Sequence, residues 1–129
     1  MKTILVVEDQ ESHAILLGWR LENEGYDVLY ATNVEDALKI IKEEKDKISL
    51  VFLDIKLPKS KEGLEIDEGG GFKIAEEIPK SIPFIFTTVY ERDDDYSRGI
   101  ELGAKAFFTK PFDTRDVANK IIEIIGKNE

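Results

Sequence analysis

The chain has 129 residues, about one domain, which is enough to bury a hydrophobic core without disulfides. Its 18 Lys and Arg face 27 Asp and Glu, giving a net charge of −9, so phosphate backbones and anionic membranes are disfavoured partners. With no Cys and one His, it cannot build disulfide frameworks, zinc–thiolate sites or multi-histidine metal sites. No apolar run approaches the ~18 residues of a membrane span, and the N-terminal run is too short for a signal peptide. We therefore expect a cytoplasmic protein with no direct contact to nucleic acid or membrane.

Five short runs rich in β-branched and aromatic residues predict strands. The first, Thr3–Val7, is a continuous run rich in β-branched residues, as in a strand buried on both faces of a parallel sheet. The other runs cover residues 27–31, 49–53, 83–87 and 105–108.

Between these runs, apolar residues recur at helical spacing. The predicted helices cover residues 11–24, 34–44, 72–78, 93–102 and 113–125. Asn33 and Asp113 are suitable N-caps, and Pro79 ends the short third helix.

Strict alternation of strands and helices predicts an α/β fold. We expect one domain over residues 1–129, with a doubly wound, five-stranded parallel sheet in the order 2-1-3-4-5 and helices on both faces. The exception is a long polar loop, residues 58–71, which ends in three glycines. Loops of this length are usually functional or mobile.

Polar residues follow the predicted strands at their carboxyl ends, where ligands bind in open α/β sheets. Glu8 and Asp9 follow the first strand, Asp54 follows the third, Thr87 ends the fourth, and Lys110 follows the fifth. In the predicted strand order these strands are neighbours, so their side chains can converge on one crevice.

Converging carboxylates repel one another, by on the order of 4 kcal/mol for a pair ~4 Å apart at an effective dielectric of ~20. A proton on one of them, or a hard cation such as Mg²⁺ among their oxygens, relieves this repulsion. A cation with open positions can also clamp a phosphoryl group, to which Lys110 would add charge and Thr87 a hydroxyl. Asp54 is then free to attack phosphorus and form an aspartyl phosphate.

These residues resemble the receiver domain of two-component response regulators. The resemblance rests on Glu8-Asp9, Asp54 with a proline four residues later, Thr87, and the sequence Lys110-Pro111-Phe112. It covers essentially the whole chain, and the pair Gly103-Ala104 before the fifth strand also fits it. No single motif is specific, but their order at successive strand ends is.

The resemblance implies a phosphoacceptor and a metal site. Asp54 resembles the phosphoacceptor, and Asp9 resembles the direct Mg²⁺ ligand. Glu8 would act mainly through water, and the backbone carbonyl of Lys56 would complete the metal site.

The resemblance also implies a switch. Thr87 resembles the hydroxyl that moves to the phosphoryl group, and Lys110 resembles its lysine partner. The resemblance also leads us to expect a cis Lys110–Pro111 bond. Phe107 occupies the aromatic switch position, although ordinary core packing is the alternative for this ring.

The implied function is signal transduction by a phosphoacceptor that catalyses only its own phosphorylation and dephosphorylation, and so is not an enzyme in the usual sense. A sensor histidine kinase or a histidine phosphotransfer protein would donate the phosphoryl group. With no output domain expected within the chain, the signal would pass to a downstream protein. We expect a monomer, with phosphorylation-dependent dimerisation left open.

The first predicted helix offers a candidate docking surface. Ile15 and Trp19 lie one turn apart at the edge of its apolar stripe. They could be partly buried in the core, or they could be exposed contacts for the phosphodonor protein.

Two features depart from the family pattern and keep alternatives open. Thr88 follows the switch hydroxyl where the family usually has Ala or Gly, and the 58–71 loop delays the third helix. The chain could therefore be a pseudo-receiver that docks without being phosphorylated, with Asp54, Asp9 and Lys110 as a structural ion-pair cluster. A flavodoxin-like cofactor carrier is disfavoured because the acidic turn after the first strand repels phosphate, and an enzyme acting on a small phosphate lacks a further acid or base.

Overall fold

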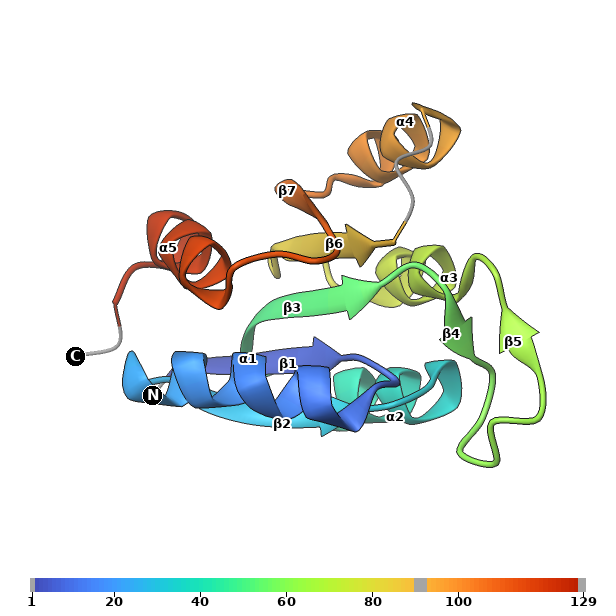
Figure 1. Ribbon diagram of the computed structural model, residues 1–129, viewed down its shortest axis with the longest axis horizontal. Coiled ribbons are helices and arrows are strands. Elements are labelled where there is room, and N and C mark those ends of the chain that lie inside the picture. Colours follow the sequence, from blue (N-terminus) through green and yellow to red (C-terminus); the bar gives the residue numbers. More distant parts are fainter. Residues whose placement is uncertain (1, 90–92, 128–129) are drawn as a thin grey trace.

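A five-stranded parallel sheet forms the centre of the computed structural model, which describes residues 2–89 and 93–127 (Figure 1). Its strands, in spatial order, are β2 (Asp27–Ala31), β1 (Thr3–Val7), β3 (Ile48–Asp54), β6 (Phe84–Thr88) and β7 (Ala106–Thr109). In chain order this is 2-1-3-4-5, so the predicted topology is confirmed. Three of the predicted strands differ from the observed ones by one residue at both ends.

Helices cover both faces of the sheet. On one face, α1 (Glu11–Asn23) contacts α5 (Thr114–Ile125). The other face carries α2 (Val34–Glu44), α3 (Gly70–Glu77) and α4 (Asp93–Leu102). The predicted spans of α2 and α4 agree with the structure. No helix in the described part of the chain is long and apolar enough to cross a bilayer.

The continuous apolar run of β1 fills two cores at once. Leu5 and Val7 pack into the core beneath α2 and α3, whereas Ile4 and Val6 pack into the core beneath α1 and α5. Successive side chains of a strand point to opposite faces, so a strand covered on both faces needs apolar residues at every position.

Local signals set the starts of two helices. The side chain of Asn33 accepts a hydrogen bond from the backbone N–H of Asp36 at the start of α2. Asp113 accepts one from the N–H of Arg115 at the start of α5. Both predicted N-caps are confirmed.

The 58–71 region is more ordered than a single irregular loop. Two short strands, β4 (Leu57–Pro58) and β5 (Ile66–Asp67), pair antiparallel in a hairpin outside the main sheet. The third helix is late and short, as expected, but it begins at Gly70. A Cβ at Gly71 would lie 2.1 Å from the backbone carbonyl of Asp54, so glycine lets α3 approach the end of β3.

Candidate functional site

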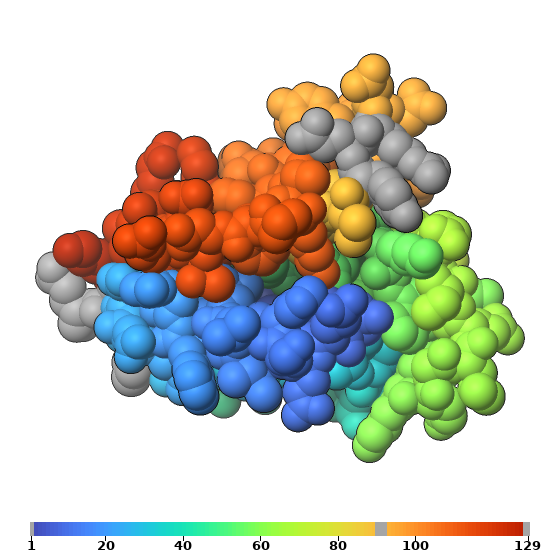
Figure 2. Space-filling view, viewed as in Figure 1, coloured from blue at the N-terminus to red at the C-terminus, as the bar shows by residue number. Residues whose placement is uncertain are grey.

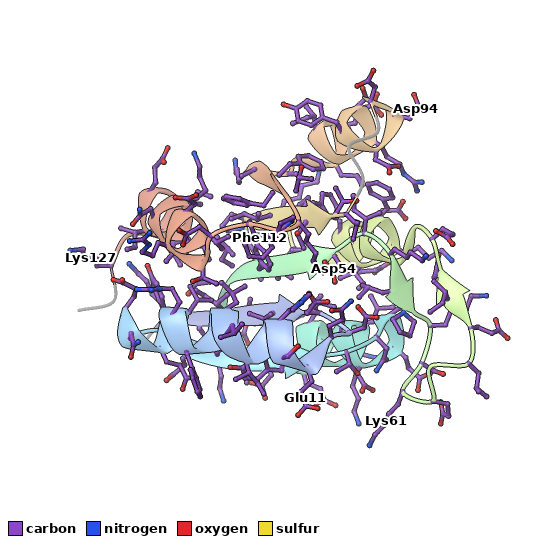
Figure 3. The ribbon with its side chains drawn as sticks, viewed as in Figure 1. Glu11, Asp54, Lys61, Asp94, Phe112 and Lys127 are labelled. Carbon is purple, nitrogen blue, oxygen red and sulfur yellow. The ribbon has the colours of Figure 1, made fainter. Side chains whose placement is uncertain are left out.

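Three carboxyl side chains meet at the carboxyl end of the sheet (Figure 3, where Asp54 is labelled). Glu8 and Asp9 follow β1, and Asp54 ends β3, which lies beside β1. One oxygen from each of the three residues lies within 4.8 Å of the others. Glu8 and Asp54 are buried, and Asp9 is exposed. The predicted convergence of the acidic residues is confirmed.

Lys110 brings a positive charge to the buried pair. Its Nζ donates hydrogen bonds to Oε1 of Glu8 at 2.6 Å and to Oδ2 of Asp54 at 3.1 Å, and it lies 3.0 Å from Oδ1 of Asp54. The backbone N–H of Lys110 donates to the carbonyl of Thr88 on β6, which fixes where the lysine leaves the sheet. The peptide bond to Pro111 is cis, as the resemblance implied.

Burial and the charges of their neighbours shift the pKa values of the two buried carboxyls, Glu8 and Asp54, in opposite directions. Burial raises the pKa of Glu8, but interactions with Asp54 and Lys110 outweigh burial and lower this pKa to about 2. Burial and the neighbouring Glu8 raise the pKa of Asp54 to about 9, despite Lys110. Without a metal, the opposite shifts of the two pKa values favour the negative charge on Glu8 and the proton on Asp54.

Glu8 and Asp54 also shift the pKa values of their charged neighbours, Asp9 and Lys110. Burial and the charge of Glu8 raise the pKa of Asp9. Burial lowers the pKa of Lys110, but the attraction of Asp54 and Glu8 outweighs it and the net shift is upward. Lys110 therefore stays cationic, whichever carboxyl holds the proton.

The donor set fits a hard divalent cation. Carboxylate oxygens of Glu8, Asp9 and Asp54 are the ligand type that Mg²⁺ prefers. Oδ1 of Asp54 is buried and accepts no hydrogen bond from the described residues. Lys110 lies 3.0 Å from this oxygen but offsets only one of the three clustered acidic groups, and a bound cation would relieve the remaining repulsion.

A pocket of about 250 Å³ opens over Asp54. Thr87 lines it from β6, where it pairs with Asp54 across the two strands. Its hydroxyl is buried and, like Oδ1 of Asp54, has no hydrogen-bond partner among the described residues. Thr88 lines the pocket as well but leaves it open, so its bulk does not close the site.

Lys56 also lines this pocket, two residues beyond Asp54. Its side chain is exposed and its Nζ lies 3.8 Å from Oε1 of Glu68, which directs the ammonium toward the loop before α3. The metal-binding role of its backbone carbonyl stays a prediction.

Phe107 is half-buried between the sheet and α4. Its ring centroid lies 5.5 Å from that of Phe86 on β6 and 4.9 Å from that of Tyr96 on α4. A Cβ at Gly99 of α4 would lie 2.1 Å from Cζ of Phe107, so α4 approaches the ring only because residue 99 is glycine. Packing explains this position of the ring, and its role as a switch stays a prediction.

The two candidate docking residues are exposed on α1. Ile15 is 40% exposed and Trp19 is 64% exposed, and Leu16 between them is exposed as well. Partial burial of Trp19 in the core was therefore the wrong interpretation. The buried stripe of α1 consists of Ala14, Leu17, Gly18 and Leu21, and Trp19 lies outside it.

Sequence reasoning missed three neighbours of the site. His13 of α1 is about half-exposed, but its Nδ1 lies 3.5 Å from Oε1 of Glu8. Pro58 and Ile66 of the hairpin line the pocket over Asp54. The spacing between β4 and β5 gave no local signal for their pairing, because each strand has only two residues.

Comparison with known sequences agrees with this geometry. A family model described as the response regulator receiver domain matches residues 4–122. The chain is 38% identical over 128 residues to the alkaline phosphatase synthesis transcriptional regulatory protein PhoP of Bacillus subtilis (strain 168). That alignment covers 99% of this chain and 50% of the relative, so the chain spans about half the length of this curated relative.

Solved structures agree as well. The non-phosphorylated HemR receiver domain from Leptospira biflexa is similar, with a TM-score of 0.82 and 31% identity, over 100% of this chain and 98% of that one. A CheY-like response regulator receiver domain protein from Methanospirillum hungatei JF-1 has a TM-score of 0.81 and 30% identity. The match covers 97% of this chain and 94% of the Methanospirillum hungatei chain.

Proposed function

Because the chain belongs to the response regulator receiver domain family, we propose that it accepts a phosphoryl group on Asp54 and relays this signal to another protein. The observation that carries the proposal is the pairing of Asp54 with Lys110 beneath an open pocket. A buried carboxyl with a positive charge beside it and a free path to solvent is suited to attack an electrophilic phosphorus.

The proposed donor is a phosphohistidine of a histidine kinase or a phosphotransfer protein. An oxygen of the Asp54 carboxylate forms the new bond to phosphorus, and the bond from phosphorus to the imidazole nitrogen breaks. The leaving nitrogen keeps the electron pair of the broken bond, and the imidazole leaves neutral because its other ring nitrogen carries a proton. Asp54 must have lost its proton for this step.

The residues around Asp54 have distinct proposed roles. Lys110, which already lies 3.0 Å from Oδ1 of Asp54, would pair with a phosphoryl oxygen. The unpartnered hydroxyl of Thr87 would donate a hydrogen bond to another phosphoryl oxygen. Lys110 already lies beside Asp54 before the phosphoryl group arrives, whereas Thr87 would move to reach it.

Glu8, Asp9 and Asp54, with the backbone carbonyl of Lys56, would hold Mg²⁺. When bound, the cation supplies positive charge that lowers the carboxyl pKa values and neutralises phosphoryl oxygens. The buried Glu8 then orients Lys110, with which it forms a 2.6 Å hydrogen bond.

The proposed output is a change in a protein-binding face. Phe107 connects β7 to α4 through Tyr96 and Gly99, and Phe86 connects the same ring to the strand that carries Thr87. A movement of Thr87 toward the phosphoryl group would shift the packing of this ring and the position of α4.

The proposal is tested by intact-mass measurement after incubation with acetyl phosphate and Mg²⁺. We expect the addition of one phosphoryl group, which a chelator and the Asp54→Ala variant both abolish. No addition under conditions that phosphorylate another receiver domain would favour a pseudo-receiver that signals by docking alone.

A further inference from the structure

The hairpin of β4 and β5 forms one wall of the pocket over Asp54. Pro58 pairs with Ile66, so their side chains lie on the same face of the hairpin, and both residues line the pocket. In Figure 2 the hairpin is the green ridge at the right of the molecule, beside the blue N-terminal part of α1. Ile66 is 46% exposed, so its side chain borders both the pocket and solvent.

The hairpin is held in place from several sides. Asp67 accepts a 2.6 Å hydrogen bond from Nζ of Lys73 on α3. The carbonyl of Lys59 accepts a hydrogen bond from the N–H of Glu35 at the start of α2, and the N–H of Lys59 donates to the carbonyl of Glu65. These bonds join the hairpin to two helices, so Ile66 has a defined position at the pocket.

The aliphatic side chain of Ile66 limits where water can enter the pocket over Asp54. Ile66 offers no hydrogen bond to a water molecule, while it occupies volume at the mouth of the pocket. A water that attacks phosphorus must enter through this mouth and be oriented by hydrogen bonds. The hairpin therefore removes both space and hydrogen-bond partners from one side of the water's path.

We propose that Ile66 sets the lifetime of the aspartyl phosphate by restricting the approach of water to phosphorus. This inference rests on the proposed phosphorylation of Asp54. In the step concerned, the water oxygen forms a bond to phosphorus and the bond from phosphorus to the Asp54 oxygen breaks. The electron pair of that bond returns to the carboxylate, and both protons of the water leave with dihydrogen phosphate.

The test compares three variants of the hairpin with the unchanged protein. Ile66→Ala opens the wall, and Ile66→Phe enlarges it. Leu64→Ala is the matched control, because Leu64 belongs to the same hairpin, is 87% exposed and loses a similar aliphatic side chain. Each protein is phosphorylated with acetyl phosphate and Mg²⁺, the donor is removed, and intact mass is followed over time in Mg²⁺.

We expect Ile66→Ala to shorten the half-life of the phosphorylated form at least about threefold, equal to about 0.65 kcal/mol in the barrier. Ile66→Phe lengthens it, and Leu64→Ala leaves it unchanged. Thermal unfolding of each variant checks that the hairpin change has not disturbed the fold.

The outcomes separate the two proposals. If the unchanged protein is phosphorylated and the phosphorylated forms of Ile66→Ala and Ile66→Phe have the same half-life as that of the unchanged protein, the proposed role of Ile66 is wrong. The proposed function then stands. An equal effect of Leu64→Ala would also overturn the role of Ile66, because it would show a general effect of the hairpin. If the unchanged protein is not phosphorylated, the proposed function fails and the inference fails with it.

Discussion

Nζ of Lys110 lies 2.6 Å from Oε1 of Glu8, although 102 positions separate the two residues in the sequence. The fold makes this contact by placing the ends of β1 and β7 on either side of β3 and β6. Lys110 thereby offsets the charge of a carboxylate that is 4% exposed. The ion pair leaves Asp54 as the carboxyl whose protonation responds to its surroundings.

The raised pKa of Asp54 makes the stability of the metal-free protein depend on pH. The pKa of Asp54 is about 9 in the folded state against an ordinary value of 3.8, so between these values the folded state binds more protons than the unfolded state. The free energy of unfolding therefore falls as pH rises from about 5 to 9, by less than about 1.4 kcal/mol per pH unit. Glu8, with its pKa lowered from 4.5 to about 2, adds a slope of opposite sign below about pH 5 that fades as pH rises further.

Urea unfolding in chelator at several pH values measures this slope. Asp54→Asn removes the titrating group, so its stability should change less between about pH 5 and 9 than that of the unchanged protein. Asp113→Asn is the control, because it changes an acidic residue outside the site and keeps an N-cap side chain. Parallel pH profiles for the unchanged protein and Asp54→Asn would contradict the raised pKa.

Addition of Mg²⁺ should stabilise the protein without any phosphodonor. Binding to the folded state raises the melting temperature by mass action, and the gain should be larger at about pH 8 than at about pH 5, because ligands must be deprotonated. Asp9→Asn should reduce this gain, whereas Asp113→Asn should keep it. Thermal unfolding over a range of Mg²⁺ concentrations checks both, and an equal gain in Asp9→Asn would contradict the assigned site.

Gly99→Ala should destabilise the contact between α4 and the sheet. The new Cβ would lie 2.1 Å from Cζ of Phe107, so the ring or the helix must move, at a cost of about 1–3 kcal/mol. Denaturant unfolding measures this loss, with the exposed Ser97→Ala on the same helix as the control. The double variant with Phe107→Leu should recover part of the stability, and no recovery would argue against the ring as the obstacle.

Trp19→Ala should change the stability of the isolated chain by less than about 0.5 kcal/mol, because the side chain is 64% exposed. Since Trp19 is the one tryptophan of the chain, its fluorescence reports on α1 directly. The unchanged protein should show the red-shifted emission and acrylamide quenching of an indole in water. A stability loss of several kcal/mol, or a shielded indole, would contradict the exposed position.

The pattern of apolar residues along the sequence predicted most of the strands and helices, because helices cover the sheet on both faces. A run such as Thr3–Val7 needs apolar residues at every position, which identifies a central parallel strand directly. The order of strand ends then predicted the site, since Glu8, Asp54 and Lys110 can meet only at one edge of the sheet. The local cap residues Asn33 and Asp113 were equally clear.

The remaining features depend on contacts that no local pattern encodes. The hairpin has two residues in each strand, too few for an alternation of polar and apolar residues to appear. Trp19 is a large apolar residue of the kind usually found in a core. It is exposed because α1 turns a different stripe of side chains toward the sheet. The approach of His13 to Glu8 depends on the same orientation of α1.

Reductive trapping tests the central claim most directly. Borohydride reduces an acyl phosphate to an alcohol, so a phosphorylated aspartate becomes homoserine, which peptide mass spectrometry locates in the sequence. After incubation with acetyl phosphate and Mg²⁺, we expect homoserine at position 54 and none at position 9. Homoserine at position 9, or a phosphorylated protein with Asp54 unreduced, would contradict the assignment of Asp54 as the phosphoacceptor.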